Sequence, residues 1–282
     1  MNQGDLYRWG RRVLADHGID TASFDAMTLL CRCLQKDRQQ ILVHGEDLAF
    51  PEAETKYRAQ IAKRAAREPL QYLLGDWEFL DMTLQVGPGV LVPREETELL
   101  CRQAAALLQP GGVGLDLCAG TGAVALGLQR LCPQKTVWAV EKYEQAFSFL
   151  CRNIQKWVPD HVKAVKADVL QGPIEGVWLY PVDFLLSNPP YVTPKAYEGL
   201  QEEVKKEPAT ALLGGEDGLL FYRVIAEKWV PRLKPGGVLA VEIGEEQAEP
   251  VGALFEQAGL CQVEVYRDFQ ELDRVITAKK RT

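Results

Sequence analysis

A short apolar strand runs directly into a glycine-rich turn at Val113-Gly114-Leu115-Asp116-Leu117-Cys118-Ala119-Gly120-Thr121-Gly122. The helical pattern of residues 123–131 follows at once. Glycines in such a turn let a ligand approach the backbone closely, and the N–H groups at the start of the helix favour an anionic group. The stretch therefore predicts an anion-binding turn, in which a carboxylate would fit as well as a phosphate.

Strand and helix patterns alternate on both sides of this turn, which predicts a mainly parallel sheet covered by helices on both faces. The expected strands are 113–119, 136–141, 162–168, 182–187, 237–243, 261–267 and 272–278. The expected helices between them are 94–109, 122–132, 143–157, 218–233 and 246–258.

The first part of the chain lacks this alternation. Residues 6–17, 23–35 and 52–67 have the apolar spacing of amphipathic helices, and residues 77–86 read as a hairpin. We therefore expect a helical domain of four or five helices at 1–75, a hairpin and linker at 76–92 and an α/β domain at 93–282.

Two of the expected strands end in an acidic residue, Glu141 and Asp168. In doubly wound folds, an acidic residue at the spacing of Glu141 meets ribose hydroxyls. The dinucleotide pattern Gly-x-Gly-x-x-Gly is absent, so a cofactor with a nucleoside at one end and an amino-acid carboxylate at the other fits better. S-adenosylmethionine has this form. Its binding residues are predicted to be Cys118, Ala119, Gly120, Thr121, Gly122, Glu141, Asp168, Val169 and Asn188.

A second motif, Ser187-Asn188-Pro189-Pro190-Tyr191, follows the strand 182–187. The prolines lack N–H groups and force the preceding residues into extended conformations, so the strand ends here. The Asn188 side-chain carbonyl and the free main-chain carbonyls can accept both hydrogens of an NH2 group, and Tyr191 supplies an aromatic face. The motif therefore favours chemistry on an amide or an exocyclic amine, although Asn-Pro is also a common turn signal.

With these motifs in place, the chain resembles the N5-glutamine methyltransferases that modify peptide chain release factors, the PrmC/HemK family. The resemblance covers nearly the whole length. The residues that carry it are Arg67-Glu68-Pro69-Leu70-Gln71-Tyr72-Leu73-Leu74-Gly75, Val90-Leu91-Val92-Pro93-Arg94, Glu96-Thr97-Glu98, Asn188-Pro189-Pro190-Tyr191, Glu207-Pro208 with Ala211-Leu212, Asp217-Gly218-Leu219, Glu242-Ile243-Gly244 and Asp273-Arg274.

The resemblance implies a seven-stranded class I S-adenosylmethionine-dependent methyltransferase domain, Rossmann-like and with an antiparallel last strand, preceded by a small helical substrate-docking domain. It implies that the glutamine of the Gly-Gly-Gln motif in class I release factors is the substrate and that S-adenosylhomocysteine is the second product. The residues that it assigns to catalysis are Asn188, Pro189 and Tyr191, with Pro190 also contacting the substrate.

Three departures from the family pattern stand out. Cys118 and Ala119 replace the first Gly and Thr of the usual glycine loop, Glu141 replaces the more frequent Asp, and Glu95 replaces a proline.

Composition fits a cytoplasmic enzyme. The 282 residues carry a net charge of −7, and the seven cysteines have no metal-binding spacing. We expect no metal, no membrane segment and a monomer. The net negative charge argues against nucleic acid as the substrate, although residues 56–67 hold five basic residues and no acidic one.

Two alternative functions stay open: an amine methyltransferase acting on DNA adenine or RNA, and a non-catalytic cofactor-binding assembly factor.

Overall fold

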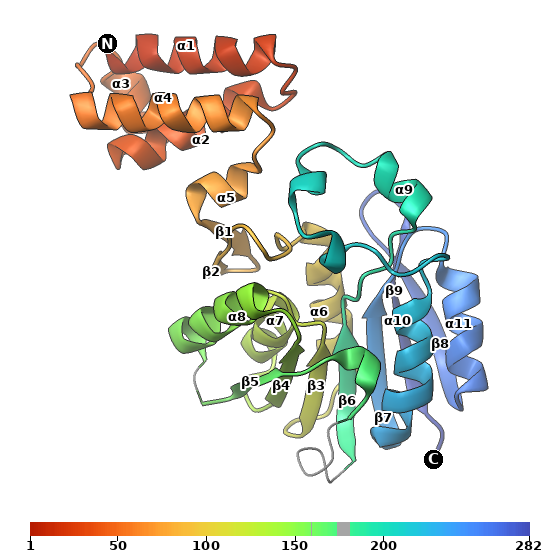
Figure 1. Ribbon diagram of the computed structural model, residues 1–282. Helices are drawn as coiled ribbons and strands as arrows, with labels where there is room; N and C mark the ends of the chain where they lie inside the picture. Colours follow the sequence, from red (N-terminus) through yellow and green to blue (C-terminus); the bar gives the residue numbers. More distant parts are fainter. Residues whose placement is uncertain (159, 174–180) are drawn as a thin grey trace. The chain divides into compact units, whose positions relative to one another are not determined.

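A computed structural model describes residues 1–158, 160–173 and 181–282 (Figure 1). The chain forms two compact units. The first comprises Met1–Asp76 together with Gln201–Lys206, and the second comprises Trp77–Leu200 together with Glu207–Thr282. No helix in the described ranges is long and apolar enough to cross a membrane.

The first unit is helical, as the apolar spacing predicts. Its core contains Leu6, Leu30, Tyr57 and Ile61, all without solvent exposure. Helices α1 and α4 approach closely because residue 10 is glycine: a Cβ there would lie 2.0 Å from the Tyr57 hydroxyl. The helices are α1 (Gln3–Asp16), α2 (Ala22–Leu34), α3 (Arg38–Val43), α4 (Pro51–Ala65) and α5 (Leu70–Leu74).

Segment Gln201–Lys206, which no sequence pattern linked to the helices, is part of this unit through ion pairs. Arg64 on α4 is buried, and its guanidinium lies 2.7 Å from Asp25 and 2.9 Å from Glu203. Arg67 also pairs with Glu203 at 3.2 Å. The basic stretch 56–67 is therefore no uniform solvated face, because Arg64 and Arg67 hold this segment.

The second unit begins with the expected hairpin, β1 (Asp76–Phe79) and β2 (Met82–Gln85), and continues as a seven-stranded sheet. The strand order is β5-β4-β3-β6-β7-β9-β8. Strand β9, the last in the chain, runs antiparallel to both neighbours, and the other pairs are parallel, as the resemblance implies. The strands are β3 (Val113–Leu117), β4 (Thr136–Glu141), β5 (Val162–Lys166), β6 (Val182–Ser187), β7 (Leu233–Glu242), β8 (Leu260–Arg267) and β9 (Asp273–Lys280).

Both faces of the sheet are covered, and each has its own apolar core. Along β6, Phe184 and Leu186 belong to the core that includes α6, α7 and α8, whereas Leu185 belongs to the core that includes α10 and α11. This alternation follows from the two-residue period of a strand. The helices are α6 (Glu95–Leu107), α7 (Ala123–Leu131), α8 (Glu144–Trp157), α9 (Pro194–Glu198), α10 (Leu220–Val224) and α11 (Ala248–Gln257).

The helix expected at 218–233 is interrupted. Regular helix covers only α10, after which the chain widens over Ile225–Trp229 and tightens over Val230–Arg232. Trp229 is fully buried there, and its Nε1 donates to the Val169 carbonyl at 3.0 Å. Pro231 lacks the N–H that a continuing helix needs. Strand β7 then starts at Leu233, four residues before the expected position.

Candidate functional site

Most of the predicted site residues follow three adjacent parallel strands, β3, β4 and β6, and Asp168 and Val169 follow a fourth, β5. The register pairs Leu117 of β3 with Val140 of β4 on one side and with Ser187 of β6 on the other. Cys118, Glu141 and Asn188 therefore emerge at one edge of the sheet. In the sheet, β4 and β5 lie on one side of β3, and the next strand in the chain, β6, lies on its other side. Ligands of open α/β sheets bind at such a switch point.

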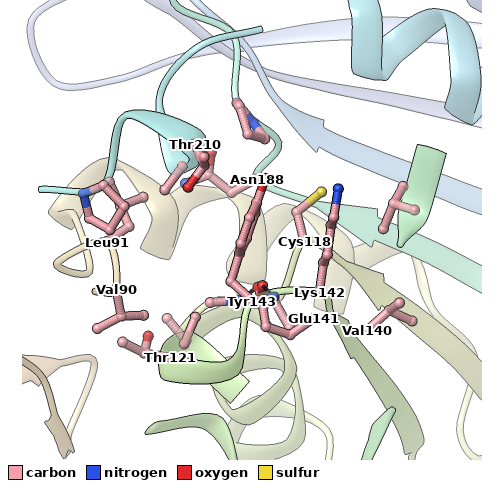
Figure 2. A pocket seen from close by; sticks show the side chains of 18 of the residues that line it. Val90, Leu91, Cys118, Thr121, Val140, Glu141, Lys142, Tyr143, Asn188 and Thr210 are labelled. Atoms are coloured by element: carbon pink, nitrogen blue, oxygen red, sulfur yellow. Dashed lines mark hydrogen bonds between the residues drawn. The ribbon is translucent and has the colours of Figure 1, made fainter. Parts of the chain in front are cut away.

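A pocket with about 920 Å³ of empty volume, open solvent included, lies at this edge. Figure 2 shows Val90 and Leu91 on one side of it, and Cys118, Val140 and Lys142 on the other. The predicted residues that line it are Cys118, Ala119, Gly120, Thr121, Glu141, Asp168, Val169, Asn188 and Pro190. Gly122 instead packs against α8, where a Cβ would meet Leu150 at 2.7 Å.

The loop of residues 118–122 keeps a tight path despite its departures from the family pattern. Cys118, Gly120 and Gly122 have φ angles of 63°, 56° and 85°. Glycine adopts this region freely, whereas cysteine is strained there. The usual glycine at position 118 therefore has a conformational reason, and the cysteine adopts the same left-handed conformation.

Glu141 joins the loop to the turn after β4. It is 6% exposed, and its Oε2 accepts from Gly120 N–H at 2.9 Å while Oε1 accepts from Tyr143 N–H at 2.7 Å. Burial raises the pKa of this carboxyl, and backbone hydrogen bonds from Tyr143, Gly120 and Lys142 oppose the rise. A carboxylate has about four acceptor positions, so acceptor capacity remains for a ligand.

Asp168 is the other acidic residue of the pocket. Its Oδ1 accepts from Leu170 N–H at 2.9 Å, and its Oδ2 lies 2.9 Å from the Lys142 ammonium. Val169 is buried beside it and lines the same pocket. Asp168 therefore offers the pocket a hydrogen-bond acceptor, and Val169 offers it an apolar wall.

Asn188 stands between this pocket and a smaller one of about 310 Å³ of empty volume, and it lines both. Pro189 and Tyr191 line only the smaller pocket. The Asn188 amide nitrogen donates to Thr97 Oγ1 at 3.1 Å. Among the described residues, no N–H or O–H donates to the Pro189 carbonyl. The Asn188 side-chain oxygen and the Pro189 carbonyl thus have acceptor capacity left within the described part of the chain.

Sequence reasoning gave no role to Thr97 or Glu242 at this edge. Thr97 lines the larger pocket, and Glu242 lines the smaller one. Buried Glu207 accepts from Val92 N–H at 2.8 Å and pairs with Arg94, which fixes the loop before α6. The available signal for Glu242 was its place directly after the apolar run of β7, the same kind of strand end as Glu141.

Residues 5–75 match the PrmC N-terminal domain, and residues 95–222 match the Methyltransferase small domain. The release factor glutamine methyltransferase of Geobacter sulfurreducens is 35% identical over 270 residues, which cover 95% of this chain and 93% of the relative. That of Cereibacter sphaeroides is 35% identical over 281 residues, 99% of both chains. This chain belongs to the release factor glutamine methyltransferase family.

Family membership makes the protein a methyltransferase. A methyltransferase from Pyrococcus furiosus has a similar fold, with a TM-score of 0.55 and 20% identity over 83% of this chain and all of that one. At this identity the likeness concerns the fold alone. The seven-stranded sheet with an antiparallel last strand and the helical N-terminal region, both expected from the resemblance, are confirmed.

Proposed function

We propose that this chain transfers a methyl group from S-adenosylmethionine to the side-chain nitrogen, N5, of the glutamine in the Gly-Gly-Gln motif of class I release factors. The observation that carries the proposal is the position of Asn188, whose side chain borders both pockets. In this assignment the larger pocket takes the cofactor, and the smaller one takes the glutamine side chain.

The larger pocket suits S-adenosylmethionine chemically. The N–H groups of Thr121, Ala123 and Val124 have no hydrogen-bond acceptor among the described residues, so the start of α7 suits a carboxylate. Glu141 keeps acceptor capacity for ribose hydroxyls. Val140, Val169 and Phe221 supply apolar walls for a planar base. The cofactor residues proposed from the sequence therefore fit this group, except that Gly122 acts through the loop conformation.

When bound, S-adenosylmethionine supplies a methyl group on a positively charged sulfur and leaves as S-adenosylhomocysteine. An amide nitrogen is a poor nucleophile because its lone pair is delocalised, so orientation must provide much of the catalysis. Asn188 Oδ1 and the Pro189 carbonyl accept the two amide hydrogens and direct the nitrogen toward the larger pocket. Their dipoles also favour the positive charge that develops on this nitrogen.

The remaining residues of the motif shape the smaller pocket. Pro190 borders the larger pocket, and Tyr191 borders the smaller one, where its ring flanks the glutamine amide. The glutamine nitrogen uses its lone pair for the new C–N bond and then releases one proton to water. This route needs no enzyme base, and neither pocket is lined by His17, His44 or His161.

The partner in this proposal is a class I release factor, and the reaction takes place in the cytoplasm with the enzyme as a monomer. The test is incubation with methyl-labelled cofactor and, separately, unmodified release factor, DNA and ribosomal RNA, followed by mass location of the label. We expect label on the Gly-Gly-Gln glutamine, and none on a release factor in which that glutamine is changed to glutamate. Label in DNA or RNA, or at another release-factor residue, would overturn the assignment.

A further inference from the structure

A buried row of hydrogen bonds lies behind Asn188 and ends on a carboxylate. Asn188 Nδ2 donates to Thr97 Oγ1 at 3.1 Å, and the Thr97 hydroxyl donates to Glu242 Oε2 at 2.6 Å. Thr97 and Glu242 are each 2% exposed, so water does not compete for these bonds. Asn188 directly follows β6, Thr97 lies on α6 and Glu242 is the last residue of β7. The three residues therefore meet only in the folded chain.

The chemistry of these groups determines which way the Asn188 amide faces. An ionised carboxylate only accepts hydrogen bonds, so the single hydroxyl proton of Thr97 points to Glu242. Thr97 Oγ1 can then only accept from its other neighbour, which must present a donor. The NH2 group of Asn188 therefore faces Thr97, and its Oδ1 faces the pockets. With the opposite polarity, Asn188 would present hydrogens to the hydrogens of the substrate amide.

We propose that Glu242, acting through the Thr97 hydroxyl, is a positioning residue that holds the Asn188 carbonyl oxygen toward the substrate amide. This inference rests on the proposed role of Asn188 in binding glutamine. Neither Thr97 nor Glu242 takes part in bond making. They determine the orientation of the residue that does contact the substrate.

The same carboxylate reaches the other side of the motif. Glu242 Oε1 accepts from the Tyr191 hydroxyl at 3.3 Å, so one group supports the residues before and after the two prolines. Its main chain is held as well, because Tyr222 donates its hydroxyl to the Glu242 carbonyl at 2.9 Å. The carboxylate is thus fixed from two sides before any substrate binds.

Charged and titratable groups face Glu242 from each element packed around it. These are Glu96 and Cys101 on α6, Tyr191 after β6, Tyr222 on α10 and Arg274 on β9. Burial above all raises the pKa of Glu242 to about 7, with Glu96 adding to the rise and Thr97 and Arg274 opposing it. Proton uptake would turn one carboxylate oxygen of Glu242 into a hydrogen-bond donor. The Thr97 hydroxyl would then no longer have to donate to Glu242, and the orientation of the Asn188 amide would no longer be fixed.

The first experiment compares Glu242→Gln, Thr97→Val and Thr97→Ser with the wild-type full chain. Thr97→Val keeps the shape but loses the hydroxyl, whereas Thr97→Ser keeps both the donor and the acceptor. We expect Glu242→Gln and Thr97→Val to lower kcat roughly 10- to 100-fold, the usual effect of removing a group that orients a functional residue. KM for release factor and Kd for S-adenosylmethionine should change little, and Thr97→Ser should retain activity.

A double-mutant cycle separates positioning from a general effect on the fold. In an Asn188→Ala background, Glu242→Gln and Thr97→Val should cost little further activity, because the group that they orient is gone. Independent, multiplying losses would overturn the inference. If Asn188→Ala is impaired while both Glu242→Gln and Thr97→Val turn over normally, the positioning role fails and the proposed function stands. Normal turnover of Asn188→Ala would instead contradict the proposed function.

The pH dependence of kcat distinguishes a positioning role of Glu242 from a purely structural one. We expect wild-type kcat to fall as pH drops below about 7, where Glu242 takes up a proton. This fall should be absent in Glu242→Gln. In Glu96→Gln, which removes a neighbouring negative charge, the inflection should move to lower pH. An unchanged inflection in both variants would contradict the inference.

Discussion

Glu141 accepts a hydrogen bond from the backbone N–H of Gly120, 21 residues earlier in the chain, at 2.9 Å. This bond joins the end of β4 to the glycine loop after β3, and both segments line the larger pocket. A residue proposed to hold the ribose therefore also holds the loop proposed to hold the methionine part of the cofactor.

Replacement of Glu141 should accordingly weaken cofactor binding. Glu141→Ala removes the loop contact and two expected charged hydrogen bonds, each worth about 1.5–3 kcal/mol at most, so Kd for S-adenosylmethionine should rise by at most roughly 10²- to 10⁴-fold. Glu144→Gln is the matched control, because it removes a nearby exposed acid that does not line the pocket. Calorimetry with S-adenosylmethionine and NAD measures both variants. Tight NAD binding without S-adenosylmethionine binding would reverse the cofactor assignment.

Asn188 should govern turnover more than cofactor binding. Asn188→Ala is expected to cut kcat by roughly 10²–10³, as when one preorganised transition-state hydrogen bond is lost. Asn188→Asp keeps an acceptor oxygen but puts a second carboxyl near Glu242, so we expect only partial activity. Single-turnover kinetics with saturating release factor and cofactor measure the effect. Near-normal rates in Asn188→Ala would leave the motif as a structural strand end.

The buried ion pair of Arg64 should matter for the stability of the helical unit. The Arg64 and Asp25 side chains are 7% and 3% exposed, so Arg64→Met leaves a buried carboxylate without its partner. We expect a loss of about 3–5 kcal/mol in unfolding free energy. Arg8→Met breaks an exposed pair with Asp5 and should cost less than about 1 kcal/mol. Urea denaturation followed by circular dichroism compares the variants, and equal losses would contradict the prediction.

Buried Asp116 should make stability fall with rising pH. Its Oδ2 accepts from Ala125 N–H at 3.0 Å, Oδ1 has no hydrogen-bond partner among the described residues, and burial raises its pKa to about 8. The folded state therefore keeps a proton that the unfolded chain releases near its ordinary pKa. The stabilising contribution is complete below about pH 4 and is lost as pH rises through about 8.

In Asp116→Asn this dependence should be smaller. The amide oxygen can still accept from Ala125, and no charge forms in the core. Unfolding free energies at about pH 5 and about pH 9 should differ less in the variant than in wild type, with Glu242 still contributing a change of the same sign. Parallel pH curves for the two proteins would show that Asp116 does not titrate in the folded state.

Much of the architecture can be predicted from the residues because its signals are local. The glycine turn after 113–117, the apolar alternation of the strands and the prolines after Asn188 act through neighbouring backbone conformations. For the same reason the pocket residues Glu141, Asp168 and Asn188 can be proposed from strand ends alone. Cys118 shows the limit of such reasoning, since only the backbone angles reveal that it occupies a left-handed position.

Contacts between distant residues required the tertiary structure. Thr97 and Glu242 are separated by 145 residues, and no periodicity relates them. Segment Gln201–Lys206 joins the helical unit through Glu203, 139 residues after Arg64. The helix after Leu219 widens where Trp229 is buried against Val169. In each case the deciding energy comes from burying polar or bulky groups against partners that only the folded chain supplies, so composition and spacing indicate the site's edge but not the network behind it.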